Sequence, residues 1–141
     1  MTRSDFQFFF PVRVRYSEID AQGIVFYAHY LTYFDTAIYE YIRWSGFDNK
    51  KMVEESQLDF HVVKSTIEYL GPSHFDDDLE IGVAPGHIGN SSVIWQVGLF
   101  RKDEPDCLTK GEIVWVCAKL GAHRSHPLPE SFLACINGQR F

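Results

Sequence analysis

The strongest constraint on the fold is a change in hydrophobic period about a third of the way along the chain. Residues 28–44 carry apolar side chains at three- and four-residue spacing, which predicts one long amphipathic helix ending near Gly46. From Phe60 onward, apolar and polar side chains alternate with a period of two, which predicts strands. These strands are joined by short turns and must pair antiparallel, because parallel pairing needs long crossovers.

The pattern therefore predicts an α+β fold, in which one long helix covers one face of a curled antiparallel sheet of about five strands. The opposite sheet face still carries apolar side chains, which favours a partner subunit. The expected strands are residues 8–17, 60–69, 79–83, 92–101 and 112–120, with a loop and short helix in 47–56, a break at 84–86, a polar turn at 101–110 and an irregular tail from 122.

Length, charge and cysteine content limit the class of protein. A chain of 141 residues can hold one real core, so we expect a single domain over residues 1–141. The formal net charge of −6 argues against a general nucleic-acid binder, and no segment approaches the roughly 20 apolar residues of a membrane span. Cys107, Cys117 and Cys135 are odd in number and widely spaced, which is typical of reduced thiols in a cytoplasmic protein.

The run from Arg15 to Tyr30 carries the clearest chemical signal. Asp20 follows the first expected strand, Gly23 permits a tight turn, and the long helix begins a few residues later. This order places a carboxylate beside the free backbone N–H groups of a helix N-terminus, and acyl transfer needs both groups. An aspartate that merely closes the turn explains the same spacing, so the residues alone leave both interpretations open.

Three motifs are typical of one known family. They are the run from Tyr16 to Tyr30, residues 67–73 followed by Asp77-Asp78-Leu79, and Pro127-Leu128-Pro129. Together they resemble the hotdog-fold acyl-CoA thioesterases of the 4-hydroxybenzoyl-CoA thioesterase family, in particular the branch that includes the Tol-Pal-associated thioesterases. The resemblance implies that the sheet wraps the helix, and that subunits join their sheets into dimers, which often pair into tetramers.

The resemblance also implies roles for single residues. Asp20 occupies the position of the catalytic carboxylate, which acts as a nucleophile or as a base on water. The backbone amide near Tyr27 is the implied oxyanion donor, and His29 stands where the family often has Asn. Residues 86–92 lack the Arg or Lys that contact coenzyme A phosphates in some relatives, which leaves Lys64, Arg101 or a neighbouring subunit to hold coenzyme A. The candidate substrate-binding residues are Gly23, Phe26, Phe60, Ser91 and Ser92.

We therefore expect an acyl-CoA thioesterase that works without a cofactor or metal. The alternatives are an acyl-carrier-protein thioesterase, a hotdog dehydratase or hydratase, whose His–acid motifs are absent, and a non-catalytic acyl-binding module. His123 and His126 form a poor metal site because no acid or thiol is nearby in the sequence. Cys107 and Cys117 lack an obvious base, and Asp76-Asp77-Asp78 is interpreted as a solvated turn.

Overall fold

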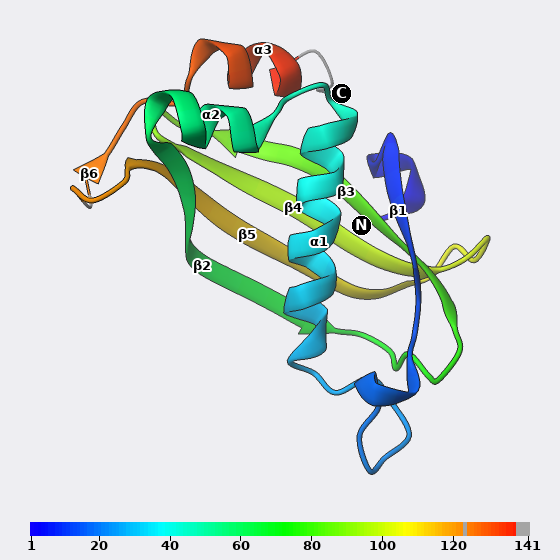
Figure 1. The fold of residues 1–141 in the computed structure, drawn as a ribbon. Helices are drawn as coiled ribbons and strands as arrows, with labels where there is room; N and C mark the ends of the chain where they lie inside the picture. The colour runs from blue at the N-terminus through cyan, green and yellow to red at the C-terminus, as the bar shows by residue number, and fades with distance from the viewer. Residues whose placement is uncertain (123, 138–141) are drawn as a thin grey trace.

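A computed structural model describes residues 1–122 and 124–137, in which one curved sheet carries a long helix across one face (Figure 1). Five long strands pair antiparallel in the order β1-β3-β4-β5-β2, and a short β6 pairs with the end of β5. This architecture confirms the predicted fold class. The elements are β1 (Phe8–Arg13), α1 (His29–Trp44), α2 (Asn49–Ser56), β2 (Leu58–Tyr69), β3 (Asp78–Ile88), β4 (Ser92–Arg101), β5 (Cys107–Lys119), β6 (Arg124–Ser125) and α3 (Glu130–Asn137), with 3-10 turns η1 (Arg3–Asp5) and η2 (Tyr16–Glu18).

Helix α1 forms where the sequence predicts it. It ends in a Schellman motif, because Gly46 N donates to Arg43 O and Phe47 N donates to Ile42 O, with Gly46 at a φ of +93°. Within the described residues, neither α1 nor another helix is long and apolar enough to cross a lipid bilayer. The buried side of α1 consists of Tyr30, Tyr33, Phe34, Ala37, Ile38, Tyr41 and Ile42.

The core lies between α1 and the inner face of β3, β4 and β5. Trp95 and Trp115 lie at its centre, with ring centroids 5.8 Å apart, and Tyr41 of α1 contacts Trp95 edge to face. Burial of such large side chains supplies most of the stabilisation of a domain of this size. The sheet and α1 therefore form one rigid support for the loop that precedes the helix.

Two expected strands have other limits in the structure. β1 ends at Arg13 instead of residue 17, because Tyr16–Glu18 turn into a 3-10 helix and leave Tyr16 76% exposed. β3 does not break at 84–86 but continues to Ile88 with an irregularity after Pro85. β1 starts opposite Val83, so β3 is an edge strand beyond that point, where proline's missing N–H costs no ladder hydrogen bond.

The C-terminal third also differs from the expectation. β5 begins at Cys107, five residues before the expected start, because Thr109 and Lys110 already pair with β4. The tail is not irregular: it holds β6 and α3, and α3 buries Phe132 and Ile136 against the core. The short helix expected in 47–56 is confirmed as α2, whose Asp48 side chain accepts from Lys51 N.

Candidate functional site

The loop between β1 and α1 folds into a small hairpin that returns to the start of the helix. Ile19 pairs with Val25, Asp20 N donates to Ile24 O at 2.9 Å, and Phe26 N donates to Glu18 O at 2.9 Å. The two arms of this hairpin are Glu18–Asp20 and Ile24–Phe26. The hairpin arm that pairs with Glu18–Asp20 therefore leads through Phe26 directly into the start of α1.

Asp20 closes the tip of this hairpin with its own side chain. Its backbone carbonyl accepts from Gly23 N at 3.0 Å, and its Oδ1 accepts from Gln22 N at 2.8 Å. Gly23 has a φ of +76°, which other residues resist. Within the described residues the second oxygen, Oδ2, accepts no hydrogen bond, and the side chain is only half-buried. One carboxylate oxygen thus serves the turn, and the other is free for chemistry.

Two backbone donors are unused at the helix start. His29 N donates to Phe26 O, whereas the N–H groups of Tyr27 and Ala28 donate no hydrogen bond within the described residues. Free N–H groups at a helix N-terminus, together with the helix dipole, bind negative charge. Tyr27 and Ala28 therefore offer the oxyanion donors that a tetrahedral intermediate requires, directly after the Asp20 hairpin.

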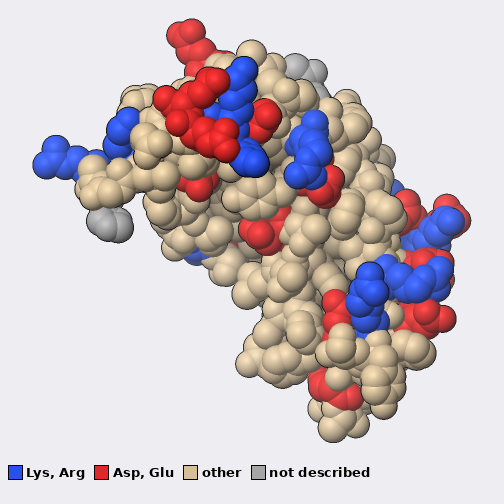
Figure 2. Space-filling view, viewed as in Figure 1, with Lys and Arg blue, Asp and Glu red and all other residues tan. Residues whose placement is uncertain are grey.

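An exposed aromatic patch surrounds the hairpin. Tyr27 contacts Phe26 and Tyr69 edge to face, and the Tyr69 hydroxyl donates to Tyr27 O at 3.3 Å. Figure 2 shows that the charged side chains gather mainly over α2 and along one flank, while the surface around the start of α1 is largely uncharged. Such a surface suits an apolar ligand group. The exposed patch consists of Tyr16, Phe26, Tyr27, Tyr69, Leu70 and Phe75.

Two ionisable groups with raised pKa values, buried Tyr33 and exposed Asp35, lie along α1 just beyond the hairpin. Burial raises the pKa of the Tyr33 hydroxyl, and the nearby Glu18 carboxylate adds to the shift. Burial also raises the pKa of Asp35, which lines a small hollow of about 220 Å³ with Leu31, Val62, Ser65 and Ile113. Sequence reasoning gave Asp35 no role because it lies off the buried stripe of the helix.

A second segment anchors the hairpin to the sheet. Val25 N donates to Ser73 O at 2.9 Å, and Ile24 forms a β-bridge with His74. Ser73 is fully buried. The sequence motifs contain Ile24, Val25 and Ser73 but not His74, and nothing in their spacing reveals that the two segments pair.

Other candidate residues lie at the end of the sheet that is far from the hairpin. Phe60 packs in the core against Trp115 and Phe132, with centroid distances of 5.4 and 4.8 Å. Ser92 begins β4, whereas Arg101 at its far end contacts the segment beside the hairpin. Ten residues of strand span roughly 30 Å, so one chain does not bring Ser91, Ser92 or Phe60 to Asp20.

The two candidate cations differ in their availability. Arg101 is engaged by Asp77 and the Pro72 carbonyl, whereas exposed Lys64 on β2 has no carboxylate partner among the described residues. His126 Nδ1 lies 2.7 Å from Pro127 O, and His123 falls outside the described residues. Of the two cations, only Lys64 has a charged group that is available to bind a phosphate.

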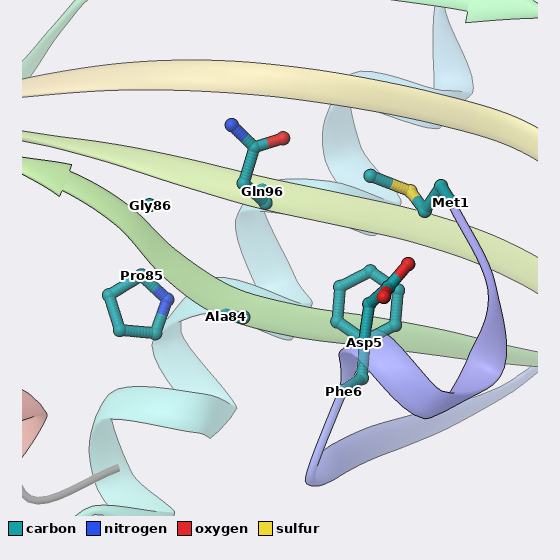
Figure 3. Close-up of a pocket in the computed structure, with 7 residues that line it drawn as sticks. All are labelled: Met1, Asp5, Phe6, Ala84, Pro85, Gly86 and Gln96. Carbon is teal, nitrogen blue, oxygen red and sulfur yellow. The ribbon is translucent and has the colours of Figure 1, made fainter. Parts of the chain in front are cut away.

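A larger hollow of about 530 Å³ lies on the sheet face opposite α1 (Figure 3). Asp5, Phe6 and Gln96 line it, and Phe6 packs there with Ala84 and Phe100 in a second small cluster. Successive strand residues point to opposite faces, so this hollow is separated from the core and from the hairpin by the sheet. It shares no residue with the Asp20 hairpin.

Comparisons with known proteins agree with this geometry. Residues 22–108 match the family model described as "Thioesterase superfamily". The chain is 31% identical over 130 residues to the acyl-CoA thioesterase YbgC of Haemophilus influenzae, which covers 92% of this chain and 94% of that protein. The crystal structure of the PA5185 protein from Pseudomonas aeruginosa superposes with a TM-score of 0.88 at 25% identity, over 99% of this chain and 95% of that one.

A further structural neighbour shows how widely the fold is shared. A 4-hydroxybenzoyl CoA thioesterase mutant solved with 4-hydroxybenzoyl CoA superposes with a TM-score of 0.85 at 17% identity, over 92% of this chain and 97% of that one. At that identity the likeness extends to the fold alone. The family resemblance drawn from the three sequence motifs is confirmed by these matches.

Proposed function

Because this chain belongs to the thioesterase superfamily, we propose that it hydrolyses acyl-CoA thioesters to a carboxylic acid and free coenzyme A, with Asp20 as the catalytic residue. The observation that carries the assignment of Asp20 is its hairpin: a carboxylate with one free oxygen lies in the turn whose second arm leads directly into the unpaired N–H groups of Tyr27 and Ala28. The relatives named as acyl-CoA thioesterases support the choice of substrate.

The proposed chemistry divides the work between these groups. Attack on the thioester carbonyl places negative charge on its oxygen, which the Tyr27 and Ala28 N–H groups stabilise. Asp20 either removes a proton from the attacking water or attacks the carbonyl itself, forming an anhydride that water then opens. In both routes the C–S bond breaks, coenzyme A leaves as its thiolate and takes up a proton, and water supplies the new oxygen of the acid. His29, the first residue of α1, lies against Phe26 and is proposed to contact the substrate.

Two residues of the hairpin are proposed to bind the substrate. They are Gly23 in its turn and the exposed Phe26 at the end of its second arm. An acyl-carrier-protein thioester is the alternative substrate, since Arg101 is engaged elsewhere and residues 86–92 contain no Lys or Arg. The proposed location is the cytoplasm, which the three free thiols favour.

We propose further that the site is completed by a second copy of the chain. β2 pairs only with β5 among the described strands, so one edge of this 12-residue strand is unpaired, and Val62 and Val63 are 55% and 59% exposed there. Antiparallel pairing of two such edges sets the start of one β2 beside the end of the other. Tyr69 at the end of β2 contacts Tyr27, so this pairing brings the partner subunit's Ser91 and Ser92 towards Asp20.

The test is release of coenzyme A from a panel of short, long and aromatic acyl-CoAs by the wild type, Asp20→Asn and Asp20→Ala. The amide oxygen in Asp20→Asn still accepts from Gln22 N, so the turn survives while the carboxylate is lost. We expect at least about a hundredfold loss of kcat with an unchanged Tm for Asp20→Asn. Turnover that survives in Asp20→Asn contradicts the assignment of Asp20, and no release by wild type contradicts acyl-CoA as the substrate.

A further inference from the structure

The catalytic hairpin depends on a segment that has little regular structure of its own. Val25 N donates to Ser73 O, and Ile24 bridges His74, so Ser73 and His74 join the hairpin to a part of the main chain that is distant in the sequence. These two residues lie in the connection between β2 and β3. A connection is held less firmly than a strand unless side chains fix it.

Arg101 fixes this connection at two points, one on each side of Ser73–His74. Its Nη2 donates to Pro72 O at 2.8 Å, and its Nε donates to Asp77 Oδ2 at 3.2 Å. Both side chains are largely shielded from solvent, with exposures of 28% for Arg101 and 22% for Asp77. Shielding strengthens a charge-assisted hydrogen bond relative to an exposed ion pair.

Asp77 continues the connection back to the hairpin. The same Oδ2 accepts from His74 N at 2.8 Å, and Asp77 N donates to His74 O at 3.2 Å. Asp77 O also accepts from Val14 N, which ties the segment to the chain that leads into the hairpin. The Arg101 guanidinium at the end of β4 thus fixes the Asp77 side chain. Asp77 in turn fixes the backbone of His74, and His74 pairs with Ile24 of the hairpin.

We infer that Arg101 is a positioning residue of the active site, which sets the backbone of the Asp20 hairpin through Asp77 and the Ser73–His74 segment. This inference rests on the proposed catalytic role of the hairpin. Arg101 reaches no coenzyme A phosphate in this role, because its Nε, Nη2 and Nη1 atoms face Asp77, the Pro72 carbonyl and Glu104. Displacement of the hairpin by about 1 Å separates the carboxylate from the oxyanion donors, and shifts of that size cost up to about a hundredfold in rate.

The chain offers a matched control. Arg13 lies on neighbouring β1 and forms ion pairs with Asp76 and Asp78, on either side of Asp77, but its side chain is 57% exposed and touches neither Pro72 nor Asp77. Arg13→Gln and Arg101→Gln therefore remove the same charge from the same turn. Only Arg101→Gln releases the segment that pairs with the hairpin.

The experiment combines kinetics on acyl-CoA with amide hydrogen exchange followed by NMR. For Arg101→Gln we expect kcat to fall by about tenfold to a hundredfold with KM within about twofold. We expect exchange of the Val25 amide to accelerate by about tenfold or more. Arg13→Gln should change neither. Asp77→Ala, which removes the acceptor shared by Arg101 Nε and His74 N, should reproduce the Arg101→Gln result. Arg101→Lys, which keeps the charge but has one donor group, should give an intermediate result.

The outcomes separate the competing explanations. If Arg101→Gln keeps the wild-type kcat and the wild-type exchange rate of the Val25 amide, the inference is overturned. A rise in KM at constant kcat also overturns it, because that result indicates a direct contact with coenzyme A. A fall in kcat with unchanged Val25 exchange also overturns it. If the wild type releases no coenzyme A, the proposed function fails, but exchange at Val25 still decides whether Arg101 positions the hairpin. If Arg101→Gln does not fold, Arg101→Lys and Asp77→Ala provide the same comparison.

Discussion

Truncation of Phe132 to alanine tests whether α3 belongs to the core of this fold. The Phe132 side chain is 0% exposed and its ring lies 4.8 Å from Phe60, 5.2 Å from Phe47 and 6.4 Å from Trp95, measured between centroids. Removal of a fully buried phenylalanine ring costs about 3–5 kcal/mol. Each lost aromatic pair adds about 0.5–1.5 kcal/mol to the loss that comes from the buried apolar area. We therefore expect the upper part of that range, about 4–5 kcal/mol.

The assay is urea denaturation followed by tryptophan fluorescence, with Phe75→Ala as the control. Phe75 is half exposed and its ring contacts Tyr16, so the same change there should cost about 1 kcal/mol. For a chain of this length, the Phe132→Ala loss corresponds to a fall in Tm of roughly 15 °C. A loss of less than about 1.5 kcal/mol for Phe132→Ala, or equal losses for the two variants, would refute the packing of α3 on the core.

Two further outcomes follow from the same structure. Burial raises the pKa of Tyr41 to about 12, above its unfolded value of about 10, so the folded state keeps a proton that the unfolded state loses. The stability from this group is complete below pH 10 and is lost as the pH rises towards 12, by up to about 1.4 kcal/mol per pH unit, and Tyr41→Phe should flatten that part of a pH–stability curve. Val63→Lys on the exposed β2 edge should shift the proposed dimer towards monomer in sedimentation velocity, whereas Gln7→Lys, with the same added charge next to β1 at the opposite edge of the sheet, should not.

The sequence predicted the elements whose side chains repeat with a clear period. α1 matches its expected range to one residue because seven buried side chains fall on one stripe. β4 matches its expected range at both ends, since Val93, Trp95, Val97 and Leu99 are fully buried at alternate positions. Burial of one helix stripe, or of every second residue of a strand, is what makes a period visible.

The elements that were missed or cut short depend on neighbours that a local pattern cannot show. Pro85 is tolerated inside β3 because β1 starts opposite Val83 and does not pair with Pro85, and only the sheet order reveals that this stretch is an edge. α3 is short, and Phe132, Leu133 and Ile136 supply only one turn of apolar side chains at helical spacing after Pro129. Its stability comes from packing on Phe47 and Phe60, which lie 85 and 72 residues before Phe132.

The uncertainty over Asp20 has a physical origin. An aspartate that closes a turn and an aspartate that serves as a base both belong directly before a helix, so spacing cannot separate the two roles. In the structure the two roles use different oxygens of one carboxylate: Oδ1 accepts from Gln22 N, and Oδ2 accepts nothing within the described residues. The turn orients the carboxylate before substrate arrives, and this preorganisation favours catalysis because no reorientation has to occur during the reaction. The turn-closing aspartate and the proposed catalytic aspartate are therefore compatible, and Asp20→Asn, which preserves the first role and removes the second, is the variant that distinguishes them.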